Sequence, residues 1–259
     1  STPATLGPAG IAGSISFKTG GRLTAVSSSG SWSSGKATGV TLVLNAARAT
    51  GAGGASSPDG PFSASFGILP SDGEASGVNV PDLDTDYPAN GNDRGLVATV
   101  ALRHGRLRLQ NAIGSQQRNL SLPLQAQYWD GSVYQINTLD SCTRLTSSQI
   151  SFGNYRNMSS ADAVVLNSPI TLSQGQALIT LRKPTVARSG SYDLALALGS
   201  TAADASCLSW TPSPAAGSGA NLSHLRWPWC GTAADKDPSA RASFGLYSGS
   251  DALIYQREN

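Results

Sequence analysis

The stretch LSLPLQAQYWDGSVYQI (residues 120–136) decides the fold class. It consists of two alternating runs that flank Asp130-Gly131. Alternation with a period of two is typical of a half-buried β-strand, because successive side chains of a strand point to opposite faces. Asp-Gly between two such runs is the strongest short signal for a β-hairpin. The stretch therefore predicts two strands, Leu120–Trp129 and Ser132–Ile136, joined by a tight turn.

Similar signals recur along the whole chain. Short apolar or alternating runs follow one another at spacings of about 8–12 residues, and no segment predicts a convincing α-helix. The other predicted strands are Ser14–Phe17, Arg22–Val26, Val40–Asn45, Phe62–Pro70, Leu96–Leu109, Gln149–Phe152, Ala163–Leu166, Ile170–Leu172, Ala177–Leu181, Ser191–Leu198, Ala240–Tyr247 and Ala252–Tyr255. We therefore expect an all-β protein with one or two antiparallel β-sandwich modules, Ig-like or jelly-roll-like, and long loops.

An acidic stretch, VPDLDTDYPANGND (residues 80–93), separates two of the predicted strands. It is dense in Asp, although charged residues make up only 13% of the chain. We expect it to mark the junction between an N-terminal β module, residues 1–94, and a C-terminal β-sandwich module, residues 95–259.

Composition narrows the function classes. The net charge is only +2 and no run of Lys or Arg forms a stripe, so a nucleic-acid partner is not expected. No apolar run reaches the roughly 18 residues that a membrane-spanning helix needs. A charge-poor surface rich in Ser, Thr and Gly is common on exported proteins. The first ten residues lack the basic and apolar regions of a signal peptide, so we expect the chain to begin after a removed signal or inside a longer precursor.

The composition favours export to an oxidising compartment, where cysteines form disulfides. The alternative is three buried thiols in a cytosolic protein. Cys207 and Cys230 flank a Pro/Ser/Gly-rich insert, and a disulfide between them would close a loop of about 22 residues, with a stabilisation of roughly 3 kcal/mol in the chain-entropy model. A bridge from Cys142 to either of them is the main alternative, because connectivity cannot be read from sequence.

The acidic stretch is also a candidate Ca²⁺ site. Alternating oxygen ligands on a turning loop suit a hard cation. However, Tyr87-Pro88 stands where known Ca²⁺ loops of this kind have Gly, and no Glu closes the loop. The alternative is a surface loop in which Asp and Asn hydrogen-bond their own backbone. The candidate ligands are Asp82, Asp84, Asp86, Asn90, Asn92 and Asp93.

Tryptophan clusters around the second and third cysteines. Trp210, Trp227 and Trp229 lie in SCLSW and HLRWPWCG, and exposed Trp rings can stack on sugars. The alternative is a small packing cluster that covers one end of a sandwich. These three residues are the candidate ligand-binding residues.

Catalytic patterns are weak, and we expect the protein not to be an enzyme. His104 and His224 are the only histidines and no G-x-S-x-G motif occurs. A glycosidase needs two acids in a cleft, and no pair is marked by the sequence. A secreted hydrolase with an unrecognised site is the remaining alternative.

Four spaced motifs resemble one protein family. They are HGRLRLQNAIGS (104–115), LPLQAQYWDG (122–131), DSCTRL (140–145) and DPSARASFGLYSGSDALIYQRE (237–258), with looser likeness in FGILP and DLDTD. They are similar to the C-terminal domain of unknown function in proteins that resemble the biogenesis protein Q of the mannose-sensitive haemagglutinin pilus. The resemblance implies a type IV pilus-associated, extracellular or cell-surface bacterial protein with no catalytic residues to carry over.

The expected function is therefore a non-enzymatic module of a pilus-associated or cell-surface adhesin. Its expected partners are pilus or other surface subunits, with host or surface glycans as further candidates. A carbohydrate-binding module that uses the Trp patch is the main alternative. No cofactor is expected other than Ca²⁺ at the acidic stretch.

Overall fold

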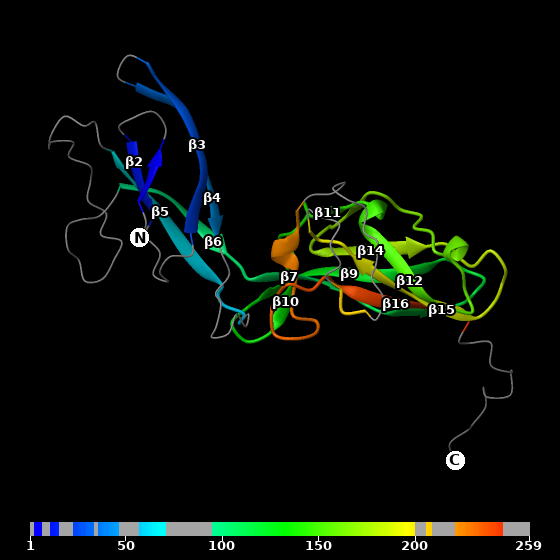
Figure 1. Cartoon of the computed structure of the whole chain (residues 1–259). Helices are drawn as coiled ribbons and strands as arrows, with labels where there is room; N and C mark the ends of the chain where they lie inside the picture. Colours follow the sequence, from blue (N-terminus) through cyan, green and yellow to red (C-terminus); the bar gives the residue numbers. More distant parts are fainter. Residues whose placement is uncertain are drawn as a thin grey trace. The chain divides into compact units, whose positions relative to one another are not determined.

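A computed structural model of the chain describes residues 3–6, 11–15, 23–33, 36–46, 57–70, 95–199, 206–208 and 221–245. These residues contain sixteen β-strands, three 3₁₀ helices and no α-helix (Figure 1). The all-β prediction is therefore confirmed. Contacts divide the chain into unit 1, Ser1–Thr50 with Ser57–His104, and unit 2, Gly51–Ser56 with Gly105–Asn259.

Unit 1 contains two antiparallel sheets. The larger has the strand order β1-β2-β5-β6, and the smaller pairs β3 with β4. Their bounds are β1 (Pro3–Leu6), β2 (Ile11–Ile15), β3 (Leu23–Ser33), β4 (Lys36–Ala46), β5 (Phe62–Pro70) and β6 (Gly95–Leu102). Strand β5 has the predicted limits. Because β6 pairs with β5 along most of its length, contacts assign β6 to unit 1, whereas the sequence placed the module boundary just before it.

Unit 2 contains two larger sheets and a short ribbon. The β9 sheet consists of β10 (Tyr134–Ile136), β9 (Leu120–Trp129), β14 (Gln176–Leu181) and β7 (Gly105–Leu109). The β15 sheet has the order β12 (Ile150–Arg156), β15 (Gly190–Leu196), β16 (Ser239–Phe244) and β8 (Ala112–Gly114). The ribbon pairs β11 (Arg144–Leu145) with β13 (Ile170–Thr171). The 3₁₀ helices are η2 (Ser147–Gln149), η3 (Ser160–Asp162) and η4 (Ser223–Leu225).

The predicted hairpin is confirmed. Strands β9 and β10 are antiparallel, with Trp129 opposite Tyr134. The Asp130 carboxylate closes the turn, because its Oδ1 accepts hydrogen bonds of 2.8 Å from the amides of Ser132 and Val133. These bonds hold the pKa of Asp130 below its ordinary value. Gly131 has a φ of +111°, a conformation that glycine adopts without steric cost.

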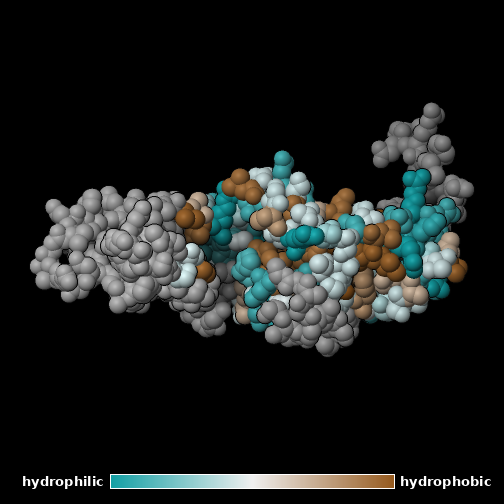
Figure 2. Space-filling view, turned by 90° about the horizontal axis from the view of Figure 1, so that it is seen from above, coloured by the Kyte–Doolittle hydropathy of each residue, from teal (hydrophilic) through white to brown (hydrophobic). Residues whose placement is uncertain are grey.

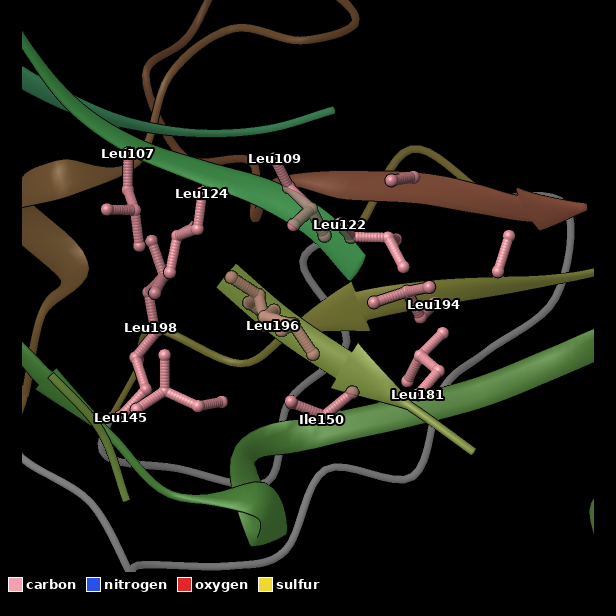
Figure 3. Close-up of a cluster of buried hydrophobic side chains, with 14 of the residues drawn as sticks. Leu107, Leu109, Leu122, Leu124, Leu145, Ile150, Leu181, Leu194, Leu196 and Leu198 are labelled. Atoms are coloured by element: carbon pink, nitrogen blue, oxygen red, sulfur yellow. The ribbon is translucent and has the colours of Figure 1, made fainter. Parts of the chain in front are cut away.

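Leucine side chains of the two large sheets form one core. Leu107, Leu122 and Leu124 of the β9 sheet point toward Leu194 and Leu196 of the β15 sheet (Figure 3). All five are 0% exposed. The two sheets of unit 2 therefore pack face to face as a sandwich, and their alternating residues fill the space between them.

Several predicted strands differ from the structure. Strands β1 and β11 were not predicted, β3 and β4 extend beyond their predicted limits, and the predicted strand Leu96–Leu109 is two strands, β6 and β7. Ala163–Leu166 is not a strand, because it contacts β14 only through an isolated bridge between Val165 and Leu181 and a bond from the Leu166 amide to Thr180. Strand β8 was not predicted, because three residues carry too little pattern. The predicted strand Ala252–Tyr255 lies outside the described residues.

The surface of unit 2 mixes residue types. Hydrophobic residues lie among hydrophilic ones on the face that Figure 2 shows. Among the described residues, Ile113, Val133, Leu139, Leu178 and Val186 are exposed hydrophobic side chains. No helix in the described part of the chain is long and apolar enough to cross a membrane.

Candidate functional site

The outer face of the β9 sheet displays polar and aromatic side chains. In β7, Leu107 and Leu109 are buried, so the alternating Arg106 and Arg108 lie on the opposite face. Arg106 stands opposite Gln127 of β9, and the same face continues to Trp129 and its partner Tyr134. The leucine alternation that builds the core thus places an arginine beside the aromatic end of the hairpin.

A loop from the C-terminal part of the chain completes this region. It begins at η4, whose Leu225 is buried against β7. A Cβ atom at Gly105 would lie only 3.3 Å from Leu225 Cδ2, so glycine allows the close approach of η4 to β7. The loop then carries Trp227 and Trp229, and the Trp227 amide donates a hydrogen bond to the Lys236 carbonyl.

Two further links hold the loop in place. Cys207 and Cys230 form a disulfide, which settles the predicted pairing and leaves Cys142 as a free, exposed thiol. Arg226 forms an ion pair with the buried carboxylate of Asp237, with 2.7 Å between Nε and Oδ1 and 3.3 Å between Nη2 and Oδ2.

The side chains meet in what we call the aromatic–arginine cluster: Arg106, Trp129, Tyr134, Trp227 and Trp229. The guanidinium carbon of Arg106 lies 3.6 Å from the centre of the Tyr134 ring, and 5.5 Å and 5.4 Å from those of Trp227 and Trp229. The Tyr134 ring centre is 5.0 Å from that of Trp227 and 5.4 Å from that of Trp129. These distances are typical of cation–π and edge-to-face contacts.

Glutamine side chains orient the guanidinium. Arg106 Nε donates a 2.9 Å hydrogen bond to Gln127 Oε1, and Gln127 Nε2 donates one of 3.0 Å to Gln125. Burial lowers the pKa of Arg106; the nearby Tyr134 acts in the opposite direction and Arg108 lowers it further. The charge is thus partly removed from water while aromatic rings cover it.

Of the predicted ligand-binding residues, Trp227 and Trp229 lie together in this cluster, and both are partly buried. Trp210 lies outside the described residues. Sequence reasoning missed Arg106, Trp129 and Tyr134 as members. The available signals were the outward arginine in GRLRL and the aromatic residues that flank Asp130-Gly131.

The predicted Ca²⁺ ligands Asp82, Asp84, Asp86, Asn90, Asn92 and Asp93 all lie outside the described residues. Within the described ranges, no group of three or more His, Cys, Asp or Glu side chains could hold a metal ion. The Ca²⁺ site therefore stays a prediction.

The histidines occupy different environments. His104 is buried, and its Nδ1 lies 3.1 Å from Asp59 Oδ1, whereas His224 is exposed on η4.

Buried carboxylates in unit 2 pair with arginine. Besides Asp237, Asp162 pairs with Arg188 at 2.6 Å and Asp193 with Arg241 at 2.7 Å. Burial alone would raise the pKa of Asp162. Hydrogen bonds from Arg188 and from the backbone amides of Ser159 and Thr185 outweigh the burial and hold the pKa well below its ordinary value. The pKa of Asp193 is also lowered, by hydrogen bonds from Arg241 and Asn154 that outweigh its burial, so Asp162 and Asp193 stay ionised. The Asp162 pair ties η3 to the loop that carries Arg188, and the Asp193 pair joins β15 to β16.

A surface pocket of about 220 Å³ lies beside one of these ion pairs. Its charged groups, Asp193 and Arg241, bond to each other, and Asn154 donates a further bond to Asp193. The charged groups of this pocket are therefore already paired with each other. Its lining residues are Asn111, Asp193, Leu208, Ser239, Ala240 and Arg241.

Comparison with known proteins identifies the family. The model of the fourth domain of DUF6701 matches residues 103–259, which is more than half of the chain, and the match begins two residues before unit 2. The chain therefore belongs to this family, which is uncharacterised. No curated protein and no solved structure matches it. The prediction that this part of the chain is a domain of unknown function is thus confirmed. The link to pilus biogenesis proteins stays a prediction.

Proposed function

We propose that this member of the DUF6701 fourth-domain family is a non-enzymatic module of an exported bacterial surface protein and works in adhesion or surface assembly. The observation that supports it best is the aromatic–arginine cluster. It brings partly buried Arg and Tyr side chains of the β9 sheet together with two Trp side chains of the loop after η4. These three residue types dominate the energetic centres of recognition surfaces.

The disulfide supports the exported location. Disulfides form and persist in secreted and cell-surface proteins and are rare in the cytosol. Cys207–Cys230 ties down the loop that carries the two tryptophans of the cluster. A charge-poor surface agrees with this location, since charged residues make up 13% of the chain.

The finer form of the proposal is association with type IV pili. Its support is the resemblance of the motifs in residues 104–145 and 237–258, most of which lie in unit 2. Unit 2 also contains the aromatic–arginine cluster, so residues 105–145 and 237–245 of these motifs lie in the same unit as the proposed recognition surface.

A bead-binding assay tests adhesion. Beads coated with the oxidised full chain are incubated with purified type IV pili, with bacteria and with host cells, and retention is counted. We expect severalfold greater retention than on beads coated with heat-denatured chain. Equal retention on both kinds of bead for every target, together with turnover of a glycoside or ester substrate by the soluble chain, would contradict the proposal.

Carbohydrate binding is a second candidate, and a specific observation favours it. Trp227 and Trp229 are partly exposed and both lie within 5.5 Å of the guanidinium carbon of Arg106, and aromatic rings of this kind can stack on sugars. A glycan array probed with the full chain tests it, with Trp227→Ala as the variant and Trp32→Ala, in unit 1, as the matched control. Loss of signal in both variants alike would argue against this site.

A further inference from the structure

The Arg106 guanidinium is held in place by a hydrogen bond at Nε and by an aromatic ring against its face. Its Nε bonds to Gln127, and its face lies against Tyr134. Within the described ranges, the bond from Nε is the one hydrogen bond that Arg106 donates, so its two terminal nitrogens have no acceptor there. Two parallel N–H groups in a fixed plane match the geometry of a carboxylate.

Among the described residues of unit 2, three other partly buried arginines have a counter-ion that Arg106 lacks. Arg188, Arg226 and Arg241 each pair with a buried aspartate, whereas no carboxylate of the described residues pairs with Arg106. Arg108, two residues along the same face, adds a second positive charge, and it disfavours the charged form of Arg106. A partly desolvated cation with no counter-ion gains free energy when an anion reaches it.

The surroundings of this cation select the kind of anion. Tyr134, Trp227 and Trp229 surround the guanidinium and are partly exposed. Aromatic faces bind the apolar C–H faces of pyranose rings, which a free inorganic anion does not have. The partly exposed Gln125 of β9 lies on the same sheet face as Arg106 and Gln127, and its side-chain amide can donate to a hydroxyl nearby.

We infer that the aromatic–arginine cluster binds an acidic sugar, with the ring carboxylate on the terminal nitrogens of Arg106 and the sugar ring against Tyr134, Trp227 or Trp229. This inference rests on carbohydrate binding, the second candidate under the proposed function. It adds that the sugar is negatively charged and that Arg106 binds the charge. The ligand class is a uronic or sialic acid unit, in free or polymeric form.

Isothermal titration of the oxidised full chain tests the inference. The probes are oligogalacturonate, the corresponding neutral galactose oligomer, and inorganic phosphate. We expect oligogalacturonate to bind about tenfold or more tightly than the neutral oligomer, since a hydrogen bond to a charged group is worth roughly that factor or more. Phosphate should bind more weakly than oligogalacturonate.

Three variants assign the effect to Arg106. Arg106→Gln removes the charge and should lower the affinity for oligogalacturonate about tenfold more than it lowers the affinity for the neutral oligomer. Arg106→Lys keeps the charge without the planar fork and should give an intermediate value. Arg118→Gln removes an exposed arginine from a turn and should stay within about twofold of the wild type. Circular dichroism and the melting midpoint confirm that each variant is folded.

The outcomes separate this inference from the proposed function. Equal affinity for the acidic and neutral oligomers, or an unchanged affinity in Arg106→Gln, overturns the acidic-sugar inference and leaves carbohydrate binding standing. Phosphate binding as tight as that of oligogalacturonate also overturns it, because the sugar ring then contributes nothing. No binding of either oligomer overturns both.

Discussion

The ion pair between Arg226 and Asp237 should contribute strongly to holding the loop after η4 on unit 2, and Asp237→Asn tests this. We call this loop, which carries Trp227 and Trp229, the tryptophan loop. The Asp237 carboxylate is 2% exposed and accepts two bonds from Arg226 and one of 3.2 Å from the Leu198 amide. Asparagine keeps the shape and removes the charge. Removing one partner of a buried pair costs about 3–5 kcal/mol, because the other charge stays buried.

The expected loss lies at the lower end of that range. The Arg226 side chain is 18% exposed, so water can partly solvate it once the carboxylate is gone. We expect the free energy of unfolding to fall by about 3 kcal/mol, which for a unit of this size corresponds to a drop of roughly 6–12 °C in the melting midpoint.

Urea unfolding followed by tryptophan fluorescence and far-UV circular dichroism measures this change. Four of the five tryptophans lie in unit 2, so fluorescence reports mainly on that unit. The matched control is Asp235→Asn, whose carboxylate is 59% exposed and lies 3.6 Å from Lys236 Nζ. It should change the stability by less than about 0.5 kcal/mol.

Two results would refute this reasoning. One is an Asp237→Asn variant within about 0.5 kcal/mol of the wild type, and the other is an equal loss in both variants. The denaturant slope should remain unchanged, because a lower slope would indicate an altered unfolded or native state and not a lost ion pair. Replacing Arg226 with Met in the Asp237→Asn background should recover part of the loss.

Three further predictions concern unit 2. Reduction of Cys207–Cys230 opens a loop with a sequence separation of 23 and should lower the free energy of unfolding by roughly 3 kcal/mol in chemical denaturation. The folded-state pKa of Asp162 lies below its unfolded value, so its contribution to the free energy of unfolding is fully present above about pH 4 and is lost as the pH falls. Between about pH 6 and pH 3 the stability of Asp162→Asn should therefore decline less steeply than that of the wild type. An equal decline in the two proteins would contradict this. Leu196→Ala, at a fully buried core position, should cost about 2–5 kcal/mol, and the exposed Leu178→Ala should cost less than about 0.5 kcal/mol in the same urea titration.

Local patterns predicted the strands whose signals are complete within a few residues. Strand β9 has the predicted limits, Leu120–Trp129, because alternation sets its face and Asp130-Gly131 sets its end. Strand β8 was missed because it pairs in parallel with β16, placing Ala112 opposite Ala242. A pairing between such distant segments leaves no mark in either short sequence.

The sequence predicted only part of the candidate site, because the side chains of the site come from segments that lie far apart in the chain. The sequence drew attention to Trp227 and Trp229 because they cluster near a cysteine. It could not show that Arg106 occupies the space between them and Tyr134, since this arrangement requires the loop after η4 to return to β7. The disulfide was one of several pairings, and only the fold brings Cys207 and Cys230 together.

The attachments of the tryptophan loop have a consequence for binding. The disulfide and the Arg226–Asp237 pair fix Trp227 and Trp229 before any ligand arrives. Ordering a loop on binding costs free energy, so a loop that is already fixed retains more of its contact energy as affinity. We therefore expect Asp237→Asn to weaken glycan binding, because it removes the two bonds that hold Arg226, the residue before Trp227. A faster dissociation rate, with Arg106-dependent discrimination between acidic and neutral sugars preserved, would mark loss of rigidity, whereas loss of that discrimination would show that the ion pair shapes the binding contacts themselves.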